Sequence, residues 1–217
     1  MEGMKQFPDK YFDLAIVDPP YGIGGGNIGK YFSRNSKEYD KKEWDKSTPN
    51  KCYFNSLFRI SNNQIICGGN YFELPISKGW IVWDKNNGEN DMPDCELLWT
   101  SFNKKIKKYT LHHFNSNYDK NRIHPTQKPS DLYRWILRNY AKPDFKIIDT
   151  HVGSGSSIIA FLDFGCEWIG FEIDEDYHKA ASERIEIHKK RTKPFFTDVE
   201  LADKNIKQKG FFDDNKP

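Results

Sequence analysis

Four residues near the amino terminus, Asp18-Pro19-Pro20-Tyr21, have the types and the spacing to act on a small polar group. They follow the apolar run Tyr11 to Val17, which predicts a buried strand that ends at the prolines, because proline cannot donate ladder hydrogen bonds. A residue before proline is held extended, so the Asp18 carboxylate and the Pro19 carbonyl are fixed in direction. Two such acceptors suit an exocyclic amine, and Tyr21 suits stacking on the ring that bears it. The alternative is a plain strand terminator with a core tyrosine.

A second set of residues has the order of a nucleoside-binding turn. Asp149 ends an apolar run, Gly153 and Gly155 let the backbone approach a ligand, and Ser156 and Ser157 open a helix whose first N–H groups have no partner. Seventeen residues after Gly155, another apolar run ends at Glu172, whose carboxylate can accept both hydroxyls of a ribose.

The type of nucleoside follows from two details of the same segment. Ile158 stands where a nicotinamide-binding turn would have its third glycine, and an acid directly before the turn repels a pyrophosphate. We therefore expect a nucleoside without phosphates, of which S-adenosylmethionine is the common one. A Gly-x-Gly pair taken by itself is equally typical of a tight turn without a ligand.

Positive charge gathers in the stretch between Lys104 and Arg138, although the whole chain has a net charge of only +2. Such a stretch, which also contains tyrosines and a phenylalanine, suits a polyanion, and the alternative is a solvated basic face. His112 and His113 lie in the same stretch, but no acid or cysteine has a suitable ligand spacing, so no metal site is expected.

The elements that must position these residues alternate between strands and helices. The predicted strands are Tyr11 to Val17, Gln64 to Cys67, Trp80 to Trp83, Leu97 to Ser101, Phe145 to Asp149 and Glu167 to Phe171. The predicted helices are Asn50 to Arg59, Ser130 to Tyr140 with Ser130 as its N-cap, Ser156 to Phe164, and Asp176 to Lys190. This order predicts an α/β fold, a mostly parallel sheet with helices on both faces.

Length and composition limit the class of protein. A chain of 217 residues with 15% aromatic residues can form one core, which we expect over residues 1–192, with 193–217 as a loosely attached tail. No apolar run is long enough for a transmembrane helix, and no signal peptide is visible. The four cysteines form no Cys-x-x-Cys pair, which is typical of a reduced, cytoplasmic protein.

Three motifs stand in an order that resembles a known family. Asp-Pro-Pro-Tyr comes first, His124-Pro125-Thr126-Gln127-Lys128-Pro129 follows, and the Asp149 to Ser157 segment comes last. This order resembles the beta class of amino-group DNA methyltransferases, which modify adenine N6 or cytosine N4, and the match spans Tyr11 to Glu186. The resemblance implies a Rossmann-like fold, S-adenosylmethionine as cofactor, and a base flipped out of double-stranded DNA.

The resemblance also implies roles for particular residues. Asp18, Pro19 and Tyr21 would be catalytic, and the region 22–121 would contain a small recognition insertion. The residues expected to hold the cofactor are Asp149, His151, Gly153, Gly155, Ser157, Glu172 and Lys128, the last beside the cofactor carboxylate or merely capping a loop. The residues expected to contact DNA phosphates are Lys104, Lys105, Lys107, Lys108 and Arg122. A homodimer and a companion restriction nuclease stay open as further partners.

Two departures from the family pattern bear on the cofactor pocket. Thr150-His151 replace the usual Pro-Phe, which changes the packing expected near the methionine moiety. The family also often has a strand before Met1-Glu2-Gly3-Met4, so either one wall of the adenine pocket is incomplete or the chain begins downstream of its natural start.

These motifs limit the possible target bases but do not decide between adenine and cytosine. Asp18 favours adenine N6, because members that act on cytosine N4 more often have serine there. Methylation of a cytosine ring carbon is rejected, since no proline is followed by cysteine. An RNA-directed enzyme and a degenerate DNA-binding subunit without turnover are the remaining alternatives.

Overall fold

The computed structural model describes residues 2–25, 42–88, 93–111 and 122–191. Within these ranges the chain forms a seven-stranded sheet with the strand order β5-β3-β4-β2-β1-β6-β7. The strands are β1 (Phe12–Val17), β2 (Ser61–Cys67), β3 (Trp80–Asp84), β4 (Cys95–Thr100), β5 (Lys107–Thr110), β6 (Lys146–Asp149) and β7 (Glu167–Gly170). The helices are α1 (Glu2–Lys5), α2 (Lys51–Ile60), α3 (Ser130–Tyr140), α4 (Ser156–Phe164) and α5 (Glu175–Arg191), with a 3-10 turn η2 (Gly69–Tyr71). The expected mostly parallel α/β fold is confirmed.

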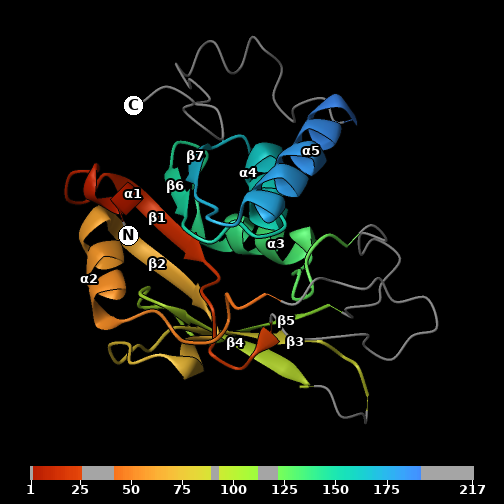
Figure 1. The fold of residues 1–217 in the computed structure, drawn as a ribbon. Helices are drawn as coiled ribbons and strands as arrows, with labels where there is room; N and C mark the ends of the chain where they lie inside the picture. The colour runs from red at the N-terminus through yellow and green to blue at the C-terminus, as the bar shows by residue number, and fades with distance from the viewer. Residues whose placement is uncertain (1, 26–41, 89–92, 112–121, 192–217) are drawn as a thin grey trace.

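Helices cover both faces of the sheet, as Figure 1 shows, with α1 and α2 on one side and α3, α4 and α5 on the other. Strand β1 is the centre of this arrangement, since it pairs in parallel with β2 on one side and with β6 on the other. Its side chains alternate between the two layers: Leu14 and Ile16 join the cluster under α3 and α4, whereas Ala15 and Val17 join the cluster under α2. A strand buried on both faces reads as a continuous apolar run, which is why the sequence predicted it well.

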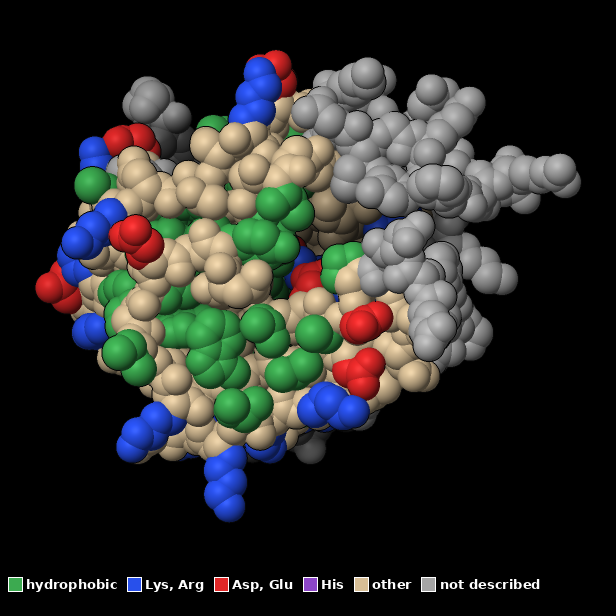
Figure 2. All heavy atoms as spheres, turned by 90° about the horizontal axis from the view of Figure 1, so that it is seen from below, with side chains coloured by type: hydrophobic (Ala, Val, Ile, Leu, Met, Phe, Trp, Pro, Cys, Tyr) green, Lys and Arg blue, Asp and Glu red, His purple; other side chains and the backbone are tan. Residues whose placement is uncertain are grey.

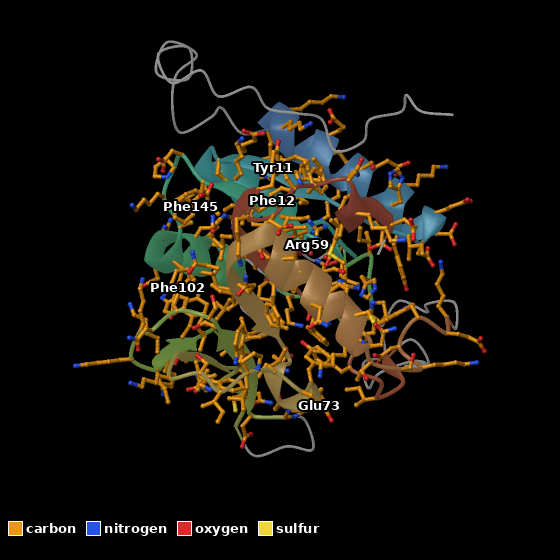
Figure 3. The ribbon with its side chains drawn as sticks, turned by 90° about the vertical axis from the view of Figure 1, so that its left-hand side faces the viewer. Tyr11, Phe12, Arg59, Glu73, Phe102 and Phe145 are labelled. Atoms are coloured by element: carbon orange, nitrogen blue, oxygen red, sulfur yellow. The ribbon has the colours of Figure 1, made fainter. Side chains whose placement is uncertain are left out.

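The layer formed by α2 is tied to the beginning of the chain by Arg59. Its guanidinium donates hydrogen bonds to the carbonyls of Met4 and Phe7 at 3.0 and 2.8 Å. Figure 3 shows Arg59 at the end of α2, facing the part of the chain that carries Tyr11 and Phe12. Asn50 caps the other end of α2 by accepting a hydrogen bond from the N–H of Tyr53 at 3.2 Å. The start of β1 is therefore held in place on that side of the sheet.

The direction of the strands decides where the site can lie. β4 is antiparallel to both β2 and β3, and the other strands run the same way as β1. The carboxyl ends of β1, β2, β3, β6 and β7 therefore meet at one edge of the sheet, and β4 begins there. We call this the catalytic edge, because Asp18 and Glu172 follow strands that end at it and Asp149 is the last residue of β6.

Two sequence predictions need adjustment. Ser130 is the first residue of α3 and the cap position is Pro129, which has no side-chain acceptor, so the predicted serine cap is not formed. Strand β5 was not predicted, because its sequence Lys-Lys-Tyr-Thr is half charged. The described part of region 22–121 supplies α2 and β2 to β5, and the recognition insertion expected within this region stays a prediction.

The tail 193–217 lies outside the described residues. In the described ranges no helix combines the length and the apolar character needed to cross a membrane.

Candidate active site

The turn after β1 brings three polar side chains into direct contact. The Nζ of Lys128 donates to both carboxylate oxygens of Asp18, each at 2.7 Å. The hydroxyl of Tyr21 donates to Asp18 Oδ1 at 2.7 Å and accepts from Lys128 Nζ at 3.0 Å. The structure thus joins the first sequence motif to the His-Pro-Thr-Gln-Lys-Pro block. Lys128, which was expected beside the cofactor carboxylate or as a loop cap, contacts Asp18 in the structure. The Tyr21 hydroxyl, which the sequence left without a role, is part of the same contact.

Lys128 is also held from its other side. Glu96, near the start of β4, places Oε2 3.2 Å from Lys128 Nζ and Oε1 2.7 Å from the Nζ of Lys85. Burial alone would lower the pKa of Lys128, but the carboxylates of Asp18 and Glu96 raise it well above its ordinary value. The lysine is therefore a fixed cation. Sequence reasoning missed Glu96 and Lys85, because their contact depends on the pairing of β3 with β4.

The ring of Tyr21 is fitted tightly between two neighbours. It stacks on the ring of Tyr71, with centroids 4.8 Å apart and planes inclined by 11°. A Cβ at Gly68 would come within 2.2 Å of the Tyr21 ring, and Gly68 has a φ of +65°. Glycine is therefore required at position 68 both for the left-handed backbone and for the close approach of the ring. Pro19 is buried beside this turn.

The loop after β6 is organised by the buried carboxylate of Asp149. It accepts hydrogen bonds from the N–H of His151 at 2.9 Å and from the hydroxyl of Ser157 at 2.5 Å. Burial raises the pKa of Asp149 to about 7. Asp149 and Ser157 thus hold the loop in shape, while Gly153 and Gly155 have φ values of +52° and +76°. The predicted Gly-x-Gly turn from strand to helix is formed.

Glu172 lies across this loop and closes it. Its Oε2 accepts from the N–H of Gly153 at 2.7 Å and its Oε1 accepts from the N–H of Asp174 at 2.9 Å. A carboxylate has about four lone-pair positions, and these two hydrogen bonds do not fill them. Burial raises the pKa of Glu172, although the N–H groups of Gly153, Ile173 and Asp174 oppose this change. The half-buried carboxylate is suited to accept two neighbouring hydroxyls, as a ribose presents them.

The two residues that depart from the family pattern form a small network with α2. The hydroxyl of Tyr53 lies 2.7 Å from Thr150 Oγ1, and the ring of Tyr53 meets that of His151 edge-on at 5.3 Å. Burial lowers the pKa of His151 to about 4, so the imidazole is neutral at pH 7. A neutral, planar side chain held by hydrogen bonds therefore stands where the family usually has phenylalanine.

Trp44 and Asp45 connect the turn after β1 to His124 and α5. The carboxylate of Asp45 accepts from the N–H groups of Gly22 and Gly25 at 2.8 and 2.6 Å. Trp44 packs on the ring of His124, which in turn lies 4.3 Å from the ring of Tyr177. The sequence singled out neither Asp45 nor Tyr177, because their roles depend on contacts between distant parts of the chain.

The basic residues predicted to meet phosphates are divided between the two ends of the sheet. Lys104 donates to the Asn139 carbonyl at 3.0 Å and Lys107 donates to Asn139 Oδ1 at 2.7 Å, near the end of α3. Because α3 begins beside Lys128 and its eleven residues span about 16 Å, these lysines lie far from the catalytic edge. Lys105 lies between them along the chain.

Two of the predicted residues lie nearer to the catalytic edge. Lys108 pairs at 3.0 Å with Asp84, the last residue of β3, and Arg122 donates at 2.8 Å to the Pro125 carbonyl. His112 and His113 lie outside the described residues. No group of three or more metal-ligating side chains gathers in the ranges that the structure describes.

Figure 2 shows a hollow with acidic and basic side chains at its bottom and hydrophobic side chains along one side.

Comparison with known proteins identifies the family. The model of the family N6_N4_Mtase, described as DNA methylase, matches residues 30–183, which is well over half of the chain. The chain belongs to this family. It is therefore a DNA methyltransferase of the amino-group class, and its cofactor is S-adenosylmethionine. The open acceptors of Glu172 and the glycine turn at 153–155 fit that cofactor.

Relatives match the chain over most of its length. It is 23% identical over 202 residues to a putative methylase, YubD, of Escherichia coli, covering 84% of this chain and 85% of the relative. It is 25% identical over 261 residues to the type II methyltransferase M.HinfI of Haemophilus influenzae, covering 95% and 71%.

Solved structures agree on the fold. The M1.HpyAVI complex with S-adenosylmethionine matches with a TM-score of 0.53 and 19% identity, over 81% of this chain and 89% of the other. The cytosine-N4-specific PvuII DNA methyltransferase matches with a TM-score of 0.53 and 15% identity, over 92% and 86%.

The placement of the lysines leads to a prediction about DNA binding. We expect the triple replacement Lys104→Gln, Lys105→Gln, Lys107→Gln to leave the salt dependence of DNA affinity unchanged, because these side chains lie at the end of the sheet opposite to Asp18. Each phosphate contact that was lost would reduce the log–log salt slope by about 0.9. Titrations of labelled duplex at several salt concentrations measure this slope, and a decrease of two or more such steps would return these lysines to the DNA interface.

Proposed function

We propose that the protein transfers a methyl group from S-adenosylmethionine to the N6 amine of an adenine flipped out of double-stranded DNA. The observation that carries this proposal is the Asp18 carboxylate at the catalytic edge, held by Lys128 and Tyr21. Adenine is preferred because Asp18 stands where members that act on cytosine N4 more often have serine. Cytosine N4 is the second candidate, since a structure specific for it shares this fold.

The state of Asp18 supports a role as a hydrogen-bond acceptor. Lys128 occupies one position on each carboxylate oxygen and Tyr21 occupies a second position on Oδ1. Of about four lone-pair positions, one therefore remains, on Oδ2. We propose that this position and the Pro19 carbonyl accept the two hydrogens of the target amine.

An aromatic amine is a poor nucleophile, because its lone pair is delocalised into the ring. Two acceptors that draw the hydrogens out of the ring plane would localise that lone pair, and the sulfonium of bound S-adenosylmethionine supplies a methyl group to be attacked. The contributions of Asp18 and Pro19 are orientation and electrostatic stabilisation, since no covalent intermediate is required. Lys128 holds the Asp18 carboxylate in place while the amine gains positive charge, and the amine proton leaves afterwards to solvent.

Tyr21 is proposed as the stacking partner of the flipped base. One face of its ring is covered by Tyr71, whose residue is 42% exposed. We propose that the base takes the position of Tyr71, which turns toward solvent as the base enters. The Tyr21–Tyr71 stack is lost and a stack between Tyr21 and the base is formed. The new stack contributes roughly 1–3 kcal/mol, which offsets the free energy lost with the old one.

The cofactor is proposed to lie along the loop from Asp149 to Ser157, with its ribose on Glu172. His151 and Thr150, held by Tyr53, would line the pocket near the methionine moiety. The space beside Gly153 is open, because a Cβ added there would have no neighbour nearer than 3.9 Å. A ligand can therefore approach the backbone at Gly153 closely.

The ribose contact can be tested by ligand-induced stabilisation. Cofactor at a hundred times its dissociation constant should stabilise the wild type by about 2.7 kcal/mol. We expect Glu172→Ala to bind S-adenosylmethionine far more weakly and to lose most of this shift in a thermal melt. Glu175→Ala, an exposed acid three residues away, is the matched control and should keep the shift. If Glu172→Ala keeps the full thermal shift, the ribose does not bind to Glu172 and this contact is refuted.

The target base and the role of Asp18 can be tested in one assay. We expect nucleoside mass spectrometry of duplex DNA incubated with the wild type to detect N6-methyladenine. Asp18→Asn should lower the rate at least about a hundredfold, as for the loss of one preorganised electrostatic contact, while S-adenosylmethionine still binds. N4-methylcytosine in place of N6-methyladenine would correct the target base, and a wild-type rate in Asp18→Asn would contradict the mechanism.

A further inference from the structure

Glu96 lies at the catalytic edge, and the reaction proposed for Asp18 and Pro19 gives it no role. Its side chain is 22% exposed and its two oxygens face two different lysines, Lys85 and Lys128. Lys85 is itself 11% exposed in its side chain, and its Nζ lies 5.2 Å from the centre of the Trp83 ring. These charges are therefore mostly removed from water, where each depends on its neighbours for compensation.

The sheet explains how two charges reach this place from separate strands. β4 is antiparallel to β3, with Asp84 opposite Cys95, so the residue after β3 and the second residue of β4 lie close together. The N–H of Lys85 also donates to the Asp94 carbonyl at 2.8 Å, which continues the pairing beyond the strands. The positions of Lys85 and Glu96 are thus set by the backbone.

Four charges then follow one another in alternation. Lys85 contacts Glu96, Glu96 contacts Lys128, and Lys128 contacts Asp18. Their sum is zero, so loss of a single member leaves one uncompensated charge next to Asp18. A neutral series of this kind can hold the Asp18 carboxylate in one orientation.

We propose that Glu96 is a positioning residue for methyl transfer, which holds the Lys128 ammonium against Asp18 while Lys85 neutralises Glu96. This rests on the proposed function of Asp18. Glu96 touches neither base nor cofactor in this scheme. Its effect reaches the amine only through Lys128 and Asp18.

Other titratable groups near Asp18 and Lys128 must be considered before the pH dependence of kcat is compared between variants. The groups that act on Asp18 or Lys128 from the neighbouring elements are Tyr21, Cys67 of β2, His124, Tyr133 of α3 and Asp149 at the end of β6. Burial raises the pKa of Cys67 and both tyrosines and lowers that of His124 to about 3, so all four are neutral near pH 7. Asp149, with a pKa of about 7, titrates in every variant, so the comparison is made between variants.

The experiment measures kcat as a function of pH between about 5.5 and about 8, on both sides of neutrality. Lys85→Met removes a positive charge that helps to lower the pKa of Glu96, so the acid limb of kcat should move up by about one pH unit. Glu96→Gln leaves a net positive charge, so its acid limb should not move up. Its kcat should fall by about tenfold to a hundredfold, because Lys128 is misplaced. The double variant Lys85→Met, Glu96→Gln is neutral again, and its acid limb should return to that of the wild type.

Controls separate this effect from general damage to the fold. Lys189→Met removes an exposed lysine on α5 that pairs with Glu186, and its acid limb should match the wild type. Lys85→Arg keeps the charge and should keep the wild-type profile, which covers the case that Lys85→Met is too unstable to assay. The KM for S-adenosylmethionine should stay unchanged in Glu96→Gln, because Glu96 does not contact the cofactor loop.

Two results would overturn the proposal. The first is a wild-type kcat and pH profile in Glu96→Gln, and the second is a double variant whose acid limb stays where Lys85→Met puts it. If the wild type itself transfers no methyl group to DNA, the proposed function fails, whereas an active wild type with insensitive variants refutes Glu96 alone.

Discussion

The buried ion pair between Lys128 and Asp18 is the interaction on which the site depends. A carboxylate and an ammonium taken out of water cost several kcal/mol each, and their attraction compensates only when the geometry is good and the remaining donors are satisfied. Here the Nζ lies 2.7 Å from both oxygens of Asp18, and its further contacts are Tyr21 and Glu96. Loss of either partner would leave an uncompensated charge, which typically costs about 3–5 kcal/mol. The pair therefore links the fold and the chemistry.

The topology of the sheet explains why the charges can meet. The turns after β1, β2, β3, β6 and β7 lie at one edge of the sheet. The antiparallel β4 adds its first residues to the same edge. Parallel strands alone would have delivered only residues that follow a strand. Glu96 comes from the beginning of a strand, and without the reversal it would lie at the other end of the sheet.

Most of the fold could be predicted from the sequence, because the central strands are buried on both faces and the helices have clear apolar spacing. The bounds of α3 and α4 were predicted correctly, and so were Asp18 and Glu172 as residues at strand ends. What the sequence could not show depends on pairing between distant strands. The contact of Lys85 with Glu96 requires the register of β3 and β4, and Tyr71 reaches Tyr21 through the left-handed turn at Gly68. The end of the sheet at which Lys104 and Lys107 lie depends on the direction of β5, which was not predicted as a strand.

The central claim is that Lys128 affects methyl transfer through Asp18 and not through a separate contact with cofactor or DNA. A double-mutant cycle on kcat tests it directly, with Asp18→Asn, Lys128→Met and the double variant compared with the wild type. If Lys128 acts through Asp18, Lys128→Met should lower kcat strongly in the wild type and very little once Asp18 is already asparagine. Losses that multiply in the double variant would show that the two residues act independently, and would contradict this account.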